Sequence, residues 1–164
     1  MKKLLVLLLS VLLFSVAASA QTHRIGAGAN YWVAVDDIDI DDIDENGFSY
    51  LASYQFRPTL VGLQVDVEFL PDLFGEDAVA PAAYVIAGKA IYAAAGVGII
   101  NSDGDWADDP FFAFKAGLDL EVIPMVFLDI SASYRFNPDI DIEDAVDDID
   151  TDTVFLGAAA RIGF

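Results

Sequence analysis

The chain has 164 residues, of which 55% are hydrophobic, and it carries 27 acidic side chains against 8 basic ones, a formal net charge of −19 at pH 7. This negative charge excludes nucleic acid as a partner, because the phosphate backbone repels it. The chain has no cysteine, which excludes a disulfide framework and lipid attachment through an N-terminal cysteine.

Residues 1–20 are predicted to be a secretory signal peptide, which leaves residues 21–164 as a single domain. Lys2 and Lys3 precede an apolar run over residues 4–14, and Ala18 and Ala20 are the small residues of a cleavage site. The alternative is a helical membrane anchor, which needs about 20 apolar residues. The run has only 11, so a signal peptide is the better interpretation.

Eight later segments alternate large apolar side chains with small or polar ones, which is the period of a β-strand with two different faces. They cover residues 24–35, 47–56, 61–69, 82–87, 90–99, 111–121, 125–136 and 153–164. The connections between them are alternately long (residues 36–46, 71–79, 101–110 and 137–152) and short (residues 57–59, 88–89 and 122–124). This order predicts an antiparallel up-and-down barrel with both termini at the short-turn end, the periplasmic end of membrane barrels.

The alternation alone does not say which face is inside, because a soluble lipocalin-like barrel would bury its apolar face. An eight-stranded barrel is only just wide enough for side chains to fill, and the polar face here is rich in glycine, alanine and serine. The apolar face carries ten aromatic residues, too many for such an interior, grouped toward the two ends of the strands as two membrane interfaces require. They are Tyr54, Phe56 and Phe164 at the short-turn end, and Phe48, Tyr50, Phe69, Phe112, Phe114, Tyr134 and Phe136 near the long loops.

With its signal peptide, eight amphipathic segments and terminal run from Ala160 to Phe164, the chain resembles the small outer-membrane β-barrel families. These are the opacity-type and outer-membrane-protein-A-like transmembrane domains. The resemblance implies an all-β, eight-stranded antiparallel up-and-down transmembrane barrel with four long acidic extracellular loops and three short periplasmic turns. It also implies a place in the cell outer membrane, among lipid and lipopolysaccharide. In those families the barrel-assembly machinery reads a last strand that ends in phenylalanine, and Ile162 and Phe164 match that signal.

The inward faces of the segments carry charged side chains, which are predicted to form a lumenal charge network. Isolated buried charges are costly, so these groups should pair across the interior, with Arg135 and Arg161 serving the acids of the third, sixth and seventh segments. One interpretation is a polar plug, and the other is a gated ion path with the charges as its selectivity lining. The network is Arg24, Asp66, Glu68, Lys115, Asp119, Glu121, Asp129, Arg135 and Arg161.

No catalytic residue is predicted. Barrel enzymes use a histidine as general base, and the only histidine here is His23, at the periplasmic start of the first segment. Ser131 and Ser133 face the lumen with no histidine in reach by topology. We therefore expect a non-enzymatic protein.

The four long connections hold 22 of the 27 acidic residues and no lysine or arginine. Residues 42–47 match the first half of an EF-hand loop, but Ser53 stands where a bidentate glutamate is needed, so no firm metal site is predicted. These carboxylates are either plainly solvated or weak, multi-site ligands for Ca²⁺ or Mg²⁺. The candidate ligands are Asp37, Asp39, Asp41, Asp42, Asp44, Asp139, Asp141 and Glu143.

Residues 37–41 and 139–143 alternate acid and isoleucine with the period of a strand. Either they form ribbons whose edge binds an extracellular protein partner, or they are flexible acidic loops. The leading functional hypothesis is an integral outer-membrane protein with a structural or surface-interaction role that presents acidic loops. The alternative is a narrow porin-like channel for small solutes or cations.

Overall fold

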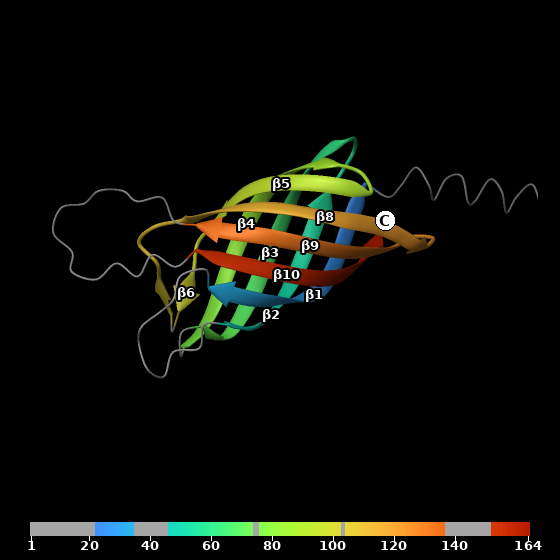
Figure 1. Cartoon of the computed structure of the whole chain (residues 1–164). Helices are drawn as coiled ribbons and strands as arrows, with labels where there is room; N and C mark the ends of the chain where they lie inside the picture. Colours follow the sequence, from blue (N-terminus) through green and yellow to red (C-terminus); the bar gives the residue numbers. More distant parts are fainter. Residues whose placement is uncertain (1–21, 35–45, 74–75, 103, 137–151) are drawn as a thin grey trace, which may run out of the picture.

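The computed structural model describes residues 22–34, 46–73, 76–102, 104–136 and 152–164, and the predicted signal peptide lies outside them. Among these residues no helix is long and apolar enough to cross a membrane. The described strands join in one sheet that curls into a barrel (Figure 1). They are β1 (His23–Ala34), β2 (Asn46–Phe56), β3 (Val61–Leu73), β4 (Glu76–Gly88), β5 (Ile91–Gly98), β6 (Asn101–Ser102), β7 (Asp105–Trp106), β8 (Phe111–Ile123), β9 (Val126–Phe136) and β10 (Thr153–Gly163).

The eight long strands follow the order β3-β2-β1-β10-β9-β8-β5-β4, and an additional β3–β4 pairing closes the ring. All neighbouring pairs are antiparallel. The first and last long strands form the seam, in register from Arg24 opposite Gly163 to Ala34 opposite Thr153. The predicted eight-stranded antiparallel up-and-down barrel is therefore confirmed. The C-terminus lies at the end of the barrel that carries the short turns (Figure 1).

The second and third long connections were predicted wrongly. β3 continues to Leu73 and β4 begins at Glu76, so two residues separate them where residues 71–79 were expected to form a loop. The third connection contains β6, which pairs with β4 with Val79 opposite Asn101, and then β7. Alternation was hard to see in β4 because its inward positions at this end are alanines, which contrast little with their neighbours.

The turn between β8 and β9 also lies one residue later than predicted. β8 runs to Ile123, and the chain reverses at Pro124 and Met125. Met125 has φ of 69°, a left-handed conformation that is uncommon for a residue other than glycine. The Met125 N–H donates to the Glu121 carboxylate at 3.1 Å, which ties this turn back to β8.

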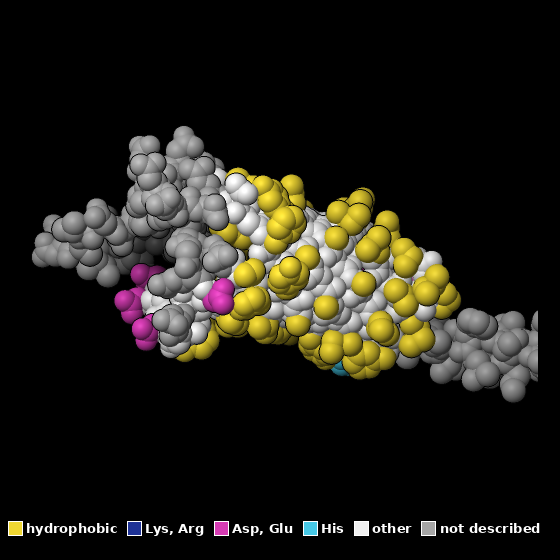
Figure 2. All heavy atoms as spheres, turned by 90° about the horizontal axis from the view of Figure 1, so that it is seen from below, with side chains coloured by type: hydrophobic (Ala, Val, Ile, Leu, Met, Phe, Trp, Pro, Cys, Tyr) yellow, Lys and Arg dark blue, Asp and Glu magenta, His cyan; other side chains and the backbone are white. Residues whose placement is uncertain are grey.

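The two faces of the barrel differ in the way that a membrane requires. Outward side chains such as Leu63 and Ile130 are 57% and 52% exposed, whereas the inward side chains of Gln64 and Asp129 are 1% and 2% exposed. Hydrophobic side chains spread over the outside of the barrel, and acidic ones gather at one end of it (Figure 2). A soluble barrel would show the reverse, so the outer face of this barrel is a lipid-facing surface.

Aromatic rings mark both ends of the lipid-facing surface. At the short-turn end the ring of His23 packs on Phe56 and Phe164, with centroids 5.0 and 5.8 Å apart. Near the loops the ring of Phe136 packs on those of Phe112 and Tyr134, at 6.0 and 5.9 Å. Of the ten aromatics predicted to face outward, nine are exposed and Phe136 is partly buried.

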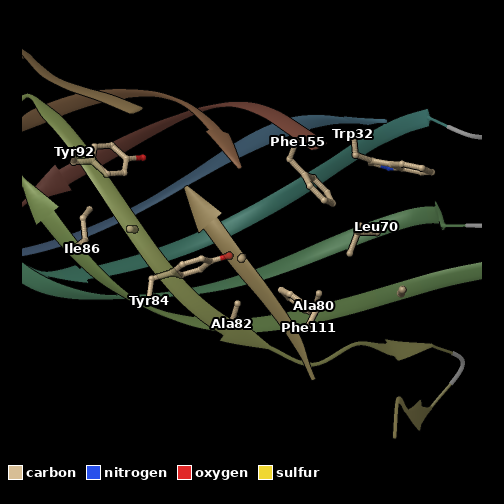
Figure 3. Close-up of a cluster of buried hydrophobic side chains, with 12 residues drawn as sticks. Trp32, Leu70, Ala80, Ala82, Tyr84, Ile86, Tyr92, Phe111 and Phe155 are labelled. Atoms are coloured by element: carbon tan, nitrogen blue, oxygen red, sulfur yellow. The ribbon is translucent and has the colours of Figure 1, made fainter. Parts of the chain in front are cut away.

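The interior also holds large aromatic rings, none of which is among the ten predicted to face outward. These rings fit because a glycine stands opposite several of them on the neighbouring strand. A Cβ added at Gly96 would lie 2.4 Å from the ring of Tyr84, and one at Gly98 would lie 2.3 Å from the ring of Phe111. The inward aromatics are Trp32, Tyr84, Tyr92, Phe111, Phe127 and Phe155, several of which appear in Figure 3.

Candidate functional site: the barrel lumen

Glu68 is the centre of the polar network in the half of the lumen nearest the loops. Its side chain is 2% exposed and forms an ion pair with Arg135 across the barrel. It also accepts hydrogen bonds from the Asn30 amide and the Ser49 hydroxyl. One carboxylate on β3 therefore ties together β1, β2 and β9.

Apolar side chains surround this ion pair on the loop side. The Arg135 guanidinium lies over the rings of Phe155 and Phe111, at 3.9 and 4.9 Å from their centroids. Phe155 pairs with Trp32 across the β1–β10 seam, and both side chains point into the interior (Figure 3). Leu70 belongs to the same buried cluster. This cluster of rings and aliphatic groups packs in the interior on the loop side of the ion pair.

A chain of amides and charges crosses the middle of the lumen. Lys115 Nζ lies 2.8 Å from Asp66 Oδ2, and Gln64 Nε2 donates to both Asp66 oxygens at 2.8 and 2.7 Å. Gln55 Nε2 donates in turn to Gln64 Oε1 at 2.7 Å. The Lys115 ammonium also lies 4.7 Å from the centre of the Tyr84 ring. Asp66 is thus compensated both by a cation and by amide donors.

Arg161 makes a further set of buried polar contacts, nearer the short turns. Its side chain is 1% exposed, and Nη1 lies 3.0 Å from Asp129 Oδ2. Its Nε donates to the Ser53 hydroxyl at 2.9 Å. Arg161 therefore joins β10 to β9 and β2.

At the short-turn mouth, two arginines share one carboxylate. Arg24 and Arg57 both pair with Asp119 Oδ2. Arg57 also donates through Nη2 to the carbonyl oxygens of Gly88 and Lys89, at 2.7 and 3.0 Å, and so holds the β4–β5 turn. Burial lowers the pKa of Arg57 below the ordinary guanidinium value, although Asp119 opposes this shift.

Arg57 was missed in the sequence analysis because it had been assigned to a turn. The inward positions of β2 are Ser49, Leu51, Ser53 and Gln55, and continuing this period by one step places Arg57 inside. The alternation therefore contained the signal. β2 itself ends at Phe56, as predicted, and Arg57 keeps the inward direction of the strand although it belongs to the turn.

Eight of the nine predicted network residues form the ion pairs described above, and Glu121 lies at the rim of the same lumen. Glu121 is exposed at the end of β8, where the interior opens toward the turn. The predicted pairing holds for Arg135 with Glu68 and for Arg161 with Asp129. It is wrong for Asp66, which pairs with Lys115, and for Asp119. That acid lies close to the short-turn end, within reach of Arg24 and Arg57.

The remaining candidate residues are placed only in part. Ile162 and Phe164 lie on the outward face of the last strand, 56% and 53% exposed, and their role in assembly stays a prediction. The Phe164 N–H donates to the His23 carbonyl at 2.9 Å, which closes the end of the seam.

Of the candidate metal ligands, all eight lie outside the described residues. Within the described part of the chain no three His, Cys, Asp or Glu side chains are grouped to hold a metal ion.

His23 lies among aromatic residues at the short-turn rim of the barrel. Its Nδ1 lies 2.7 Å from the Tyr54 hydroxyl, and its ring packs among aromatic rings at the rim. Ser133 is buried in the lumen on β9. The described contacts of His23 are thus with aromatic residues.

No protein-family model matches this sequence, and no curated protein sequence is similar to it at a significant level. Solved structures are similar in fold. The crystal structure of Neisserial surface protein A is 17% identical with a TM-score of 0.66, and the match covers 87% of this chain and 97% of that one. The N-terminal β-barrel domain of OprF from Pseudomonas aeruginosa is 15% identical with a TM-score of 0.51, over 85% of this chain and 97% of that one. The chain therefore has the fold of the small eight-stranded outer-membrane β-barrels.

Proposed function

We propose that this protein is a non-enzymatic integral outer-membrane barrel with a closed lumen, which acts as a structural and surface-exposed component of the envelope. It presents its acidic connections at the outer surface. The observation that carries this proposal is the burial of the side chains that line the lumen.

The lumenal side chains leave no room for water beside them at several levels of the barrel. Trp32 and Gln55 are 0% exposed, Gln64 is 1% exposed, and Glu68 and Arg161 are 2% exposed. A conducting pore needs a continuous wet path lined by polar or charged groups. These groups lie instead in direct contact with each other across the barrel, as expected for an eight-stranded barrel whose interior is filled by side chains.

Opening such a path would separate paired charges inside the barrel. Breaking one partner away from a buried ion pair leaves an uncompensated charge and costs about 3–5 kcal/mol. The Glu68 and Asp66 carboxylates also accept hydrogen bonds from neutral donors, which an opening of the lumen would have to break as well. The closed arrangement is therefore strongly favoured over an open one.

The proposal of a non-enzymatic role rests on the lumenal chemistry. The buried acids are neutralised by guanidinium or ammonium groups, which suits structural pairing better than proton transfer. The single histidine, His23, is hydrogen-bonded to the Tyr54 hydroxyl at the aromatic rim. A barrel of this kind offers its surface, and not a catalytic centre, to its surroundings.

Vesicle swelling tests the closed lumen with neutral solutes. The purified protein is reconstituted into lipid vesicles, which are diluted into isotonic solutions of a small sugar or amino acid. We expect the vesicles to swell no faster than protein-free vesicles, while vesicles containing a wide porin swell rapidly. Swelling that becomes faster with the amount of the barrel protein would contradict the closed lumen and support the channel alternative.

A further inference from the structure

A cavity of about 560 Å³ opens at the short-turn end of the barrel. The turns after β2 and β4 and the ends of β1, β8 and β9 form its walls. Its charged lining residues are Arg24, Arg57, Lys89, Asp119 and Glu121. Phe127 lies under the Arg24 guanidinium, which is 3.6 Å from the ring centroid. We call this cavity the vestibule.

The vestibule is the place where the positive charge of the lumen exceeds the negative charge. Among the described residues, the lumenal ion pairs join five basic side chains to four acidic ones. Asp66, Glu68 and Asp129 each have one cation, whereas Asp119 is shared by two arginines. The described residues that line the vestibule include three basic side chains, Arg24, Arg57 and Lys89, and two acidic ones, Asp119 and Glu121, a net charge of +1.

This excess charge lies in a poorly solvated place, where it attracts an anion strongly. The side chains of Arg57 and Asp119 are 4% and 1% exposed. Burial lowers the pKa of the Arg57 guanidinium, and the positive charge of Arg24 acts in the same direction. A bound anion would relieve both effects, because it supplies the missing negative charge beside the two guanidinium groups.

The vestibule also contains a polar acceptor and a donor without hydrogen-bond partners in the described part of the chain. Asp119 Oδ1 and Arg24 Nε are both buried and unpaired, so a rotation of these side chains must accompany their contact with a ligand in the cavity. A ligand that satisfies this site must accept hydrogen bonds from guanidinium groups and donate one to a carboxylate. A partly protonated phosphate does both, because its oxygens accept and its O–H group donates. Sulfate is fully ionised at neutral pH and has no proton to donate.

We propose that the vestibule is a binding site for phosphate, either free or as the terminal group of a small phosphate monoester. Arg24 and Arg57 hold the phosphate oxygens, Asp119 accepts its hydroxyl proton in a hydrogen bond, and Lys89 attracts the anion at the rim. The volume exceeds that of one phosphate and falls within the range of small-molecule pockets, about 300–1,000 Å³. The site faces the short-turn side, so its ligand comes from the compartment opposite the acidic connections. The proposal does not depend on whether the lumen conducts.

The test measures binding of inorganic phosphate and of sulfate to the purified full-length protein in neutral detergent micelles, by calorimetry and by phosphorus NMR line broadening at constant ionic strength. The parent protein should bind phosphate saturably and at least about threefold more tightly than sulfate, a difference expected from one hydrogen bond. Lys89→Gln, an exposed change that leaves the fold intact, should weaken phosphate binding about threefold through the loss of rim charge. Arg57→Gln should weaken it at least about tenfold.

Asp119→Asn gives the sharpest readout, because it removes the carboxylate that competes with an anion for the two guanidinium groups. It also introduces an N–H donor. Sulfate should then bind at least about as tightly as phosphate, and both more tightly than to the parent. The matched control is Arg135→Gln, the same loss of one guanidinium at the opposite end of the lumen, which should leave phosphate affinity unchanged in folded protein. The proposal is overturned if the parent does not bind phosphate saturably, or if it binds phosphate and sulfate with equal affinity. It is also overturned if Arg135→Gln loses as much phosphate affinity as Arg57→Gln.

Discussion

At the scale of single residues, the interior is organised around carboxylates that each serve several strands. Glu68 is the clearest case, since a cation and two neutral donors from three other strands converge on it. Such a group is costly to bury alone and stabilising only as a fully satisfied network. Removal of one partner should therefore cost much more than the loss of a surface ion pair.

Arg135→Ala tests this at the Glu68 site. Breaking a fully buried pair costs about 3–5 kcal/mol. Because 11% of the Arg135 side chain is exposed, we expect a smaller loss of about 2–3 kcal/mol in the free energy of unfolding, measured by denaturant titration in lipid vesicles. The double change Arg135→Ala with Glu68→Gln should recover part of that loss, because no buried charge is then left alone. An unchanged unfolding midpoint for Arg135→Ala would show that the network does not stabilise the barrel.

Leu63→Arg tests the lipid-facing surface. Leu63 lies on the outward face of β3 and is 57% exposed, so the new charge would face hydrocarbon. The expected cost is about 2–4 kcal/mol in the same unfolding assay. The control is Thr59→Arg in the exposed β2–β3 turn, which should cost less than about 1 kcal/mol because the charge stays in water. Equal costs for the two changes would place Leu63 outside the hydrocarbon layer.

At the scale of elements, the inward side chains of neighbouring strands are matched in size as well as in polarity. Trp32 stands opposite Gly47, and Tyr84 opposite Gly96, so a large ring on one strand uses the space that the next strand leaves free. This matching lets a narrow barrel hold six aromatic rings together with its charges. Rings and glycines on neighbouring strands thus fill parts of the interior that the polar network leaves free.

Much of this arrangement could be predicted from period-two alternation, because a strand between lipid and lumen must alternate its side chains. The eight long strands, the outward direction of Leu63 and the inward direction of Glu68 all follow from that one rule. The first residues of β4 could not be predicted from this alternation, because the alanines at their inward positions differ little in size or polarity from their neighbours. The pairing partner of Asp119 did not follow either, since it depends on the stagger of the strands around the barrel, which local patterns do not contain.

The acidic segments 36–45 and 137–151, which lie outside the described residues, carry a prediction at the same scale. Their carboxylates would lie beside the phosphates of outer-membrane lipopolysaccharide, and we propose that divalent cations bridge the two negative layers. Protease cleavage within these segments should become faster when Ca²⁺ is removed by a chelator, while the folded barrel remains intact. The same cleavage rates with Ca²⁺ and with chelator, at matched ionic strength, would leave these acids as plainly solvated groups.

At the scale of the whole molecule, the barrel is apolar outside and filled inside. The outer face exposes its large hydrophobic side chains, and the interior buries charged groups such as Asp129 and Arg161 almost completely. This distribution suits a protein that is stable in a membrane and conducts nothing through its centre. On the function proposed above, its functional surfaces are its two ends, the vestibule on one side and the acidic connections on the other.

Single-channel recording in a planar bilayer tests the closed lumen most directly. The folded protein is inserted and its conductance is recorded in concentrated salt, where even a narrow cation path would carry measurable current. We predict a baseline without resolved openings, and the same baseline at either polarity of the applied voltage. Stable, repeated conductance steps whose number grows with the amount of inserted protein would contradict the closed lumen and establish a channel.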